Sequence, residues 1–199
     1  GTLSNSSNVT QTAVYLVTPS FGTCSGVSNS GNQFTVTVYV NPAPAINTIN
    51  RTICTGTSFV VTPTNGTDGF VPTGVTYVWG APSYGNASMS GGDSQTSASP
   101  NIFGGPLYNP TNSPYTVTYT VTPGTGNCTG LPFTVVVTVD PKPQVNAMST
   151  VVCSGALFVV SPTNVTNGLV PTGTLYQWSA PTGNDLSLIH ISEPTRPRL

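Results

Sequence analysis

Two stretches of the chain alternate apolar and polar residues with a period of two. In YTVTYTVTP at 115–123 and FTVVVTVD at 133–140, every second residue is Tyr, Val or Phe, and Thr fills most of the positions between them. This alternation is typical of a half-buried strand whose apolar side chains lie on the core face. The residues predicted to face inward are Tyr115, Val117, Tyr119, Val121, Phe133, Val135, Val137 and Val139.

Shorter strands are predicted elsewhere in the chain. Phe59 and Val61 mark one strand, and Val75, Tyr77 and Trp79 mark another. No window has the apolar spacing of a helix. Short strands between turns rich in Gly and Pro, in a unit of about 100 residues, indicate a two-sheet β-sandwich of the immunoglobulin type. We therefore predict an all-β fold.

The sequence repeats itself with a period of 99 residues. Residues 41–82 align without a gap on 140–181, and 21 of the 42 pairs are identical. Cys54 matches Cys153, and Trp79 matches Trp178. A period of this length is a whole domain, because solenoid repeats run about 20 to 50 residues. The chain therefore divides into tandem modules: the C-terminal part of a first (1–41), a complete module (42–140) and the N-terminal part of a third (141–185).

Two proline-rich segments separate these modules. They are NPAP at 41–44 and DPKP at 140–143. Two prolines in four residues favour an extended, semi-rigid joint and remove backbone donors. We expect the modules to lie in line.

The two ends of the chain suggest a fragment. The segment LSLIHISEPTRPRL at 186–199 holds the only His (His190) and the only Glu (Glu193). Its first eleven residues resemble the in-frame translation of a transposase-type sequencing adapter, and the alternative is a natural C-terminal tail. We interpret 186–199 as a disordered sequencing artefact and exclude it from the fold. Because the chain begins at Gly1 rather than Met, we expect its start to be a cut.

Charge and hydropathy limit the possible partners. Charged residues make up 5% of the chain, with four Lys and Arg against five Asp and Glu. Such a surface has no basic patch for nucleic acid or anionic lipid. No apolar run approaches the roughly 20 residues of a membrane helix. We expect no nucleic-acid partner and no membrane insertion of this fragment.

Each module carries a cysteine near its beginning (Cys54, Cys153) and one near its end (Cys24, Cys128). A disulfide between Cys54 and Cys128 would make the complete module a self-contained unit, and disulfides point to an oxidising compartment. The alternative joins Cys24 to Cys54 and Cys128 to Cys153 across the linkers, and sequence alone does not decide between them. We favour the pairing within the module. Because CxxC spacing is absent, we predict no cysteine metal site.

The residues of the repeat do not form a recognisable catalytic motif. With His190 in the excluded tail, no imidazole is left for a Ser-His-Asp or Cys-His arrangement. The complete module has Asp68, Asp93 and Asp140, and none lies in a recognisable acid–base motif. We predict no enzyme activity, no catalytic residue and no cofactor.

The loop TPTNGTDG offers oxygen atoms of the kind that calcium prefers, from Asn65 and Asp68. The equivalent loop has Asn164 and Asn167, which removes the charge, and calcium usually takes several carboxylates. We favour a turn in which these side chains bond their own backbone, and we predict no metal site.

Aromatic residues between 83 and 110 are the candidate ligand contacts. Tyr84, Phe103 and Tyr108 lie in a stretch expected to form loops on a rigid sandwich. Loops of this kind commonly carry binding, and aromatic faces stack on sugars. The alternative is that these side chains cap the sandwich or fill its core.

Two long phrases carry a family resemblance. ICTGTSFVVTPTNGTDGFVPTGVTYVW at 53–79 and YTVTYTVTPGTGNCTGLPFTVVVTVDPKP at 115–143 resemble the PKD-like, immunoglobulin-like repeats of large secreted adhesins and gliding-associated surface proteins of bacteria. Trp79 resembles the core Trp that packs on an immunoglobulin disulfide. The resemblance implies an extracellular array on the bacterial cell surface, with neighbouring modules as partners and no catalytic residues.

Two functions follow from this resemblance. The first is a non-catalytic structural spacer, or stalk repeat, of a secreted adhesin-type surface protein. The second is an adhesive module that binds extracellular glycans or proteins through the loops at 83–110.

Overall fold

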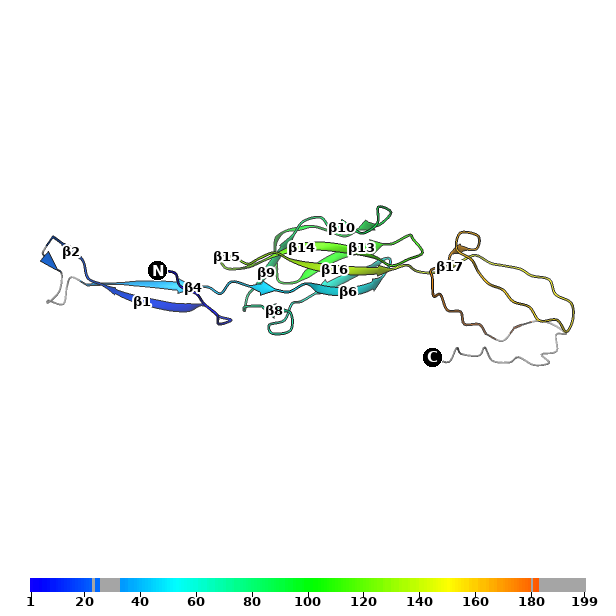
Figure 1. Ribbon diagram of the computed structural model, residues 1–199, viewed down its shortest axis with the longest axis horizontal. Coiled ribbons are helices and arrows are strands. Elements are labelled where there is room, and N and C mark those ends of the chain that lie inside the picture. The colour runs from blue at the N-terminus through cyan, green and yellow to red at the C-terminus, as the bar shows by residue number, and fades with distance from the viewer. Residues whose placement is uncertain (23, 26–32, 180, 183–199) are drawn as a thin grey trace.

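A computed structural model describes residues 1–22, 24–25, 33–179 and 181–182. Every regular element among them is a strand, so the predicted all-β fold is confirmed. Within these ranges no helix has the length and apolar character needed to cross a membrane. An N-terminal hairpin, a central sandwich and a C-terminal part with few strands lie in line (Figure 1). The segment 186–199, interpreted above as an artefact, lies outside the described residues.

The larger sheet of the central sandwich has the strand order β12-β9-β14-β16-β6. The short strands β10 and β15 pair with β14. All neighbours are antiparallel except β6, which runs parallel to β16 along one edge. The strands of this sheet are β6 (Ile49–Cys54), β9 (Thr76–Trp79), β10 (Ser83–Tyr84), β12 (Gln95–Ser99), β14 (Tyr115–Thr125), β15 (Cys128–Thr129) and β16 (Phe133–Asp140).

The smaller sheet has the order β11-β13-β7 and covers the apolar face of the larger one. Its strands are β7 (Thr57–Val61), β11 (Ser90–Gly91) and β13 (Ile102–Tyr108). A further two-stranded pair, β5 (Ala45–Ile46) with β8 (Gly69–Phe70), lies beside the start of the unit.

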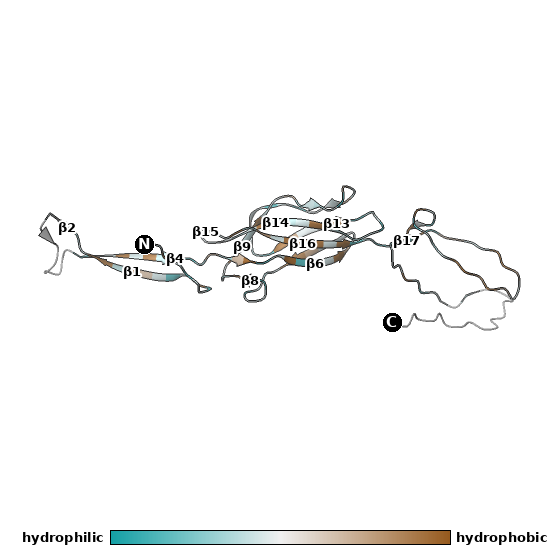
Figure 2. Cartoon of the chain, viewed as in Figure 1, coloured by the Kyte–Doolittle hydropathy of each residue, from teal (hydrophilic) through white to brown (hydrophobic). Residues whose placement is uncertain are grey.

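The core forms between the two sheets as the alternation predicts. Burial along β16 switches between buried and half-buried at every residue. Val117, Tyr119 and Val121 of β14 are fully buried, and Tyr115 packs against the core from its edge. Figure 2 shows the apolar residues along these strands. Because the core cluster of the described residues runs from Ile46 to Val139, the central unit carries its own core.

One glycine has a steric reason to be there. A Cβ on Gly104 would stand 2.5 Å from Cε1 of Phe59 and 2.8 Å from the Tyr119 hydroxyl. Phe59 and Tyr119 meet edge to face at a centroid distance of 5.3 Å. The absence of a side chain at Gly104 therefore leaves room on β13 for the Phe59 ring and the Tyr119 hydroxyl.

The chain enters and leaves the sandwich at opposite ends. The proximal end, beside the linker 41–44, holds the β14–β15 turn: the Cys128 thiol lies 3.9 Å from the Asn41 carbonyl oxygen. The distal end is the last residue of β16, Asp140, which lies opposite Cys54 in β6. Strand β14 has 11 residues. At about 3.4 Å per residue it spans roughly 37 Å between the two ends.

The N-terminal hairpin repeats the last two long strands of the central unit. Its strands are β1 (Gln11–Val17), β2 (Ser20–Phe21), β3 (Cys24–Ser25) and β4 (Phe34–Val40). Gln11 pairs with Val40 in β1–β4, as Tyr115 pairs with Val139 in β14–β16. Tyr15 is 46% exposed, whereas Tyr119 at the same place of the central unit is 0% exposed. The difference arises because no second sheet covers the hairpin in the described chain.

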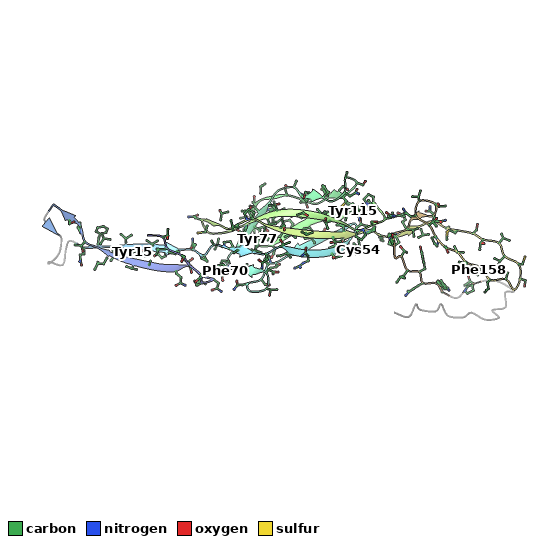
Figure 3. The ribbon with its side chains drawn as sticks, viewed as in Figure 1. Tyr15, Cys54, Phe70, Tyr77, Tyr115 and Phe158 are labelled. Carbon is green, nitrogen blue, oxygen red and sulfur yellow. The ribbon has the colours of Figure 1, made fainter. Side chains whose placement is uncertain are left out.

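The C-terminal part has the first strands of the repeat but not the last ones. Its described strands are β17 (Gln144–Val145) and β18 (Gly168–Leu169), which pair as β5 and β8 do. Phe158 is 64% exposed (Figure 3), although Phe59 at the same repeat position is 5% exposed. The described residues after 141 carry the apolar pattern of the repeat but no counterpart of β14 and β16. Phe158 therefore lacks there the strand against which Phe59 packs in the central unit.

Candidate functional site

The three aromatics proposed as ligand contacts lie on the strands β10 and β13, so the expectation that they lie in loops is wrong. Phe103 and Tyr108 stand five positions apart on β13, which is roughly 16 Å along a strand. The Phe103 ring meets Trp79 edge to face, with a centroid distance of 5.2 Å and an interplanar angle of 89°. Phe103 therefore packs against Trp79, while its side chain remains 38% exposed.

Tyr84 and Tyr108 lie on either side of the short strand β11. The Tyr84 hydroxyl donates a hydrogen bond to the Gly91 carbonyl oxygen. Tyr108 pairs with Ser90, the residue before Gly91. Both rings remain exposed. Tyr84, Phe103 and Tyr108 are 41%, 38% and 51% exposed, so all three stay candidate ligand contacts.

The TPTNGTDG loop is a turn, as predicted. The Asp68 carboxylate accepts hydrogen bonds from the Thr64 amide at 2.8 Å and the Thr64 hydroxyl at 3.1 Å. Asn65 accepts one from the Val71 amide at 2.9 Å. In the third repeat Asn167 accepts from the Thr163 amide at 2.8 Å, so an amide oxygen replaces the carboxylate without changing the turn. The described residues contain no group of three or more His, Cys, Asp or Glu side chains arranged to hold a metal.

The predicted Cys54–Cys128 disulfide is wrong for this chain. Both residues are free cysteines. Cys54 lies at the distal end, near Tyr115 (Figure 3), and Cys128 lies at the proximal end. The length of β14 separates them, whereas a disulfide requires Cα atoms within about 7 Å. Trp79 consequently packs on Phe103 rather than on a disulfide.

The alternative pairings across the linkers are also too far apart. The backbone of Cys24 lies beyond the Phe34 end of the first hairpin, and Cys54 lies at the distal end of the sandwich. Cys128 lies at the proximal end, whereas Cys153 follows the distal linker. A whole strand length or more separates the members of each pair.

A buried asparagine was missed by the sequence analysis. Asn109 is 1% exposed, and its amide donates to the carbonyl oxygens of Ser113 and Val139, each at 2.8 Å. Asn5 makes the same two bonds in the first hairpin, to Val9 at 2.8 Å and Val40 at 2.7 Å. The signal is a second alignment, of residues 4–26 on 108–130, which pairs these two asparagines.

The same segment meets the next unit of the chain. The Thr73 amide donates to the Asn8 carbonyl oxygen at 3.0 Å, across the first junction. A shallow hollow beside it is lined by Leu3, Asn5, Ala43 and Phe70, among others. The main-chain bond and the adjoining apolar side chains hold the hairpin against the sandwich.

The strongest electrostatic perturbations fall on buried tyrosines. Burial raises the pKa of Tyr119 to about 12, and the neighbouring Tyr84 and Asp93 add to the effect. Burial likewise raises the pKa of Tyr77 to about 12, with a smaller contribution from Asp68. The Tyr119 hydroxyl has no hydrogen-bond partner. Raised pKa values keep both phenols neutral, so they serve the core and do not act as bases.

Sequence comparison agrees with this geometry. Residues 51–143 match the family model of the PKD-like domain. The match spans β6 to β16 and so covers the central sandwich. The central unit is a β-sandwich that is similar to the PKD-like domain over these residues. PKD-like domains are generally non-catalytic and commonly extracellular. No curated protein matches the chain.

Proposed function

We propose that this protein is a non-catalytic spacer: a stalk repeat of a secreted, adhesin-type protein on the bacterial cell surface, built from the modules 1–41, 42–140 and 141–185. The observation that carries the proposal is the placement of the two linkers at opposite ends of the sandwich. A unit threaded in this way adds its full long dimension to the array. A unit with both linkers at one end would add little.

The linkers support the same conclusion. Pro42 and Pro44, and Pro141 and Pro143 one period later, restrict the backbone between successive sandwiches. The first linker also contacts the sandwich, because a Cβ on Gly130 would overlap the Pro44 carbonyl oxygen. Successive units in such an array are held in a fixed direction, which suits a stalk.

The experiment is a length series. Since the unit 42–140 carries its own core, arrays of one, two and four copies can be measured by small-angle X-ray scattering. A stalk predicts a maximum dimension that grows linearly, by roughly 35–40 Å per added copy. Growth with the square root of copy number would mean freely jointed units and would overturn the proposal.

The adhesive alternative rests on Tyr84 and Tyr108. A glycan array and a pull-down with the unit 42–140 test it directly. Reproducible binding that is lost in Tyr84→Ala and Tyr108→Ala, but kept in Leu131→Ala, would replace the spacer with an adhesive module. Leu131 is a suitable control because it is an exposed apolar residue in the loop before β16.

A further inference from the structure

Successive units of this chain meet in the same way at both described junctions. The Thr73 amide donates to the Asn8 carbonyl oxygen at 3.0 Å, and the Thr172 amide donates to the Asn112 carbonyl oxygen at 3.4 Å. Thr172 lies one period after Thr73, and Asn112 takes the place of Asn8 in the second alignment. A contact observed at one junction can therefore be transferred to the other.

At the first junction a cysteine touches the preceding linker. The Cys128 thiol lies 3.9 Å from the Asn41 carbonyl oxygen. Gly126 and Gly130 flank it, and a Cβ on either would crowd Asn41 or Pro44. The β14–β15 turn of a unit thus lies directly on the linker through which the chain enters that unit.

At the second junction a different cysteine touches the following linker. Cys54 lies opposite Asp140 in the parallel pair β6–β16. The amide of the next residue, Thr55, donates to the Asp140 carbonyl oxygen at 2.8 Å. Asp140 lies one period after Asn41, so it is the same linker residue. Cys54 is exposed and is therefore open to a partner from the following unit.

These two contacts converge on one residue. In an uninterrupted array, Cys54 of one unit and the counterpart of Cys128 in the next unit both adjoin the linker residue Asp140. Cys54 lies one strand spacing, about 4.8 Å, from Asp140. By the repeat, the thiol of the Cys128 counterpart lies next to the carbonyl oxygen of the same residue, as Cys128 lies 3.9 Å from that of Asn41. We propose that a disulfide joins Cys54 of each unit to the Cys128 counterpart of the following unit and staples every junction of the array.

This pairing accounts for the free cysteines. The partner of Cys128 belongs to a position that aligns before residue 1, and the partner of Cys54 belongs to a position that aligns after residue 185. Neither position falls within the present sequence. This disulfide concerns how units are joined, so the proposal is the same whether the array is a spacer or an adhesive.

The reaction is an ordinary thiol–disulfide exchange. One cysteine thiolate attacks a small disulfide oxidant such as oxidised glutathione, which forms a mixed disulfide and releases one thiol. The second cysteine thiolate then attacks the protein sulfur of that mixed disulfide, which forms the new S–S bond and releases the second thiol. The two protein thiols lose two electrons and two protons, and the oxidant is reduced to two thiols.

The test uses two copies of residues 42–140 joined directly, so that Pro42 of the second copy follows Asp140 of the first. The protein is equilibrated with oxidised and reduced glutathione, its thiols are blocked, and its disulfides are located by peptide mapping. We expect one bridge, between Cys54 of the first copy and Cys128 of the second, with the other two cysteines unbridged. A single copy treated in the same way should form no internal bridge.

Matched variants make the result decisive. Cys54→Ser in the first copy should abolish the bridge, whereas Cys54→Ser in the second copy should leave it intact. Both variants change the same exposed side chain, so a general folding defect would affect them equally. A bridge within one copy, a bridge insensitive to the first variant, or no bridge at all would overturn the inference.

Discussion

The side-chain amide of Asn109 donates a hydrogen bond of 2.8 Å to the backbone carbonyl oxygen of Val139. This bond joins the turn after β13 to the last core strand, close to the distal end of the sandwich. The side-chain oxygen of Asn109 accepts hydrogen bonds from the Thr111 amide at 3.0 Å and the Thr111 hydroxyl at 2.7 Å. The side chain is thus fully satisfied inside the protein, as a buried amide must be.

Asn109→Ala should lower the free energy of unfolding by about 2–3 kcal/mol, because it removes the buried hydrogen bonds from the side-chain amide to the Ser113 and Val139 carbonyl oxygens. Urea unfolding of the chain measures the change. Asn127→Ala makes the same chemical change at an exposed position and should have an effect below about 0.5 kcal/mol. Equal effects of the two variants would contradict the role assigned to Asn109.

Tyr119→Phe should raise the free energy of unfolding by about 1 kcal/mol. Its hydroxyl is buried without a hydrogen bond, so removing it removes an uncompensated desolvation cost. Tyr84→Phe should lower the same quantity by about 0.5–1 kcal/mol, because the Tyr84 hydroxyl bonds the Gly91 carbonyl oxygen. Parallel urea titrations compare the two. A loss of stability in Tyr119→Phe would reveal a partner for that hydroxyl.

Alkaline pH should destabilise the sandwich through Tyr77 and Tyr119. Burial raises the pKa of each to about 12 in the folded protein. An unfolded tyrosine loses its proton near pH 10. Between these values the unfolded state binds fewer protons than the folded state, so the tyrosine contribution is constant below about pH 10 and is lost as the pH rises toward about 12.

Unfolding measured in steps across this range, with Tyr77→Phe/Tyr119→Phe as the comparison, tests this expectation. The wild-type free energy of unfolding should fall more steeply with pH than that of the double variant. Parallel curves would show that these two phenols are not responsible.

Limited proteolysis with a protease that cuts after aromatic residues should report the different burial of equivalent residues in the two repeats. Phe158 and Trp178 are 64% and 65% exposed, whereas Phe59 and Trp79 are 5% and 3% exposed. Among these four positions, cleavage should therefore occur first after Phe158 or Trp178, and mass spectrometry of early fragments identifies the sites. Early cleavage after Phe59 or Trp79 would contradict the packing of the central unit.

The sequence analysis succeeded where the pattern is local. The alternation along β14 and β16 predicts which side chains are buried, because side chains of a strand point to alternate faces. The TPTNGTDG turn was also predictable, since Asn65 and Asp68 bond backbone atoms within six residues. Both features depend on neighbours close in sequence.

The candidate sites failed where the answer depends on topology. The Cys54–Cys128 bridge was favoured because it would make the module self-contained, but Cys54 precedes the β6–β7 turn at one end and Cys128 lies in the β14–β15 turn at the other. Phe103 was expected in a loop, but it lies on β13 and its ring meets Trp79 edge to face. No spacing in the sequence encodes either relationship.

The sequence by itself determined the strands with regular alternation, the repeat and the polar turns, because each follows from side-chain periodicity or from direct comparison of residues. It did not predict the strands β10, β11, β12 and β13, which lie in the stretch expected to form loops. The tertiary structure alone decided which ends of the sandwich hold the cysteines, which aromatics stay exposed and whether a repeat buries its core. Phe59 and Phe158 illustrate the reason: they occupy the same place in nearly the same sequence, yet only Phe59 is buried. Burial requires the later strands of the unit, and those strands are distant in sequence.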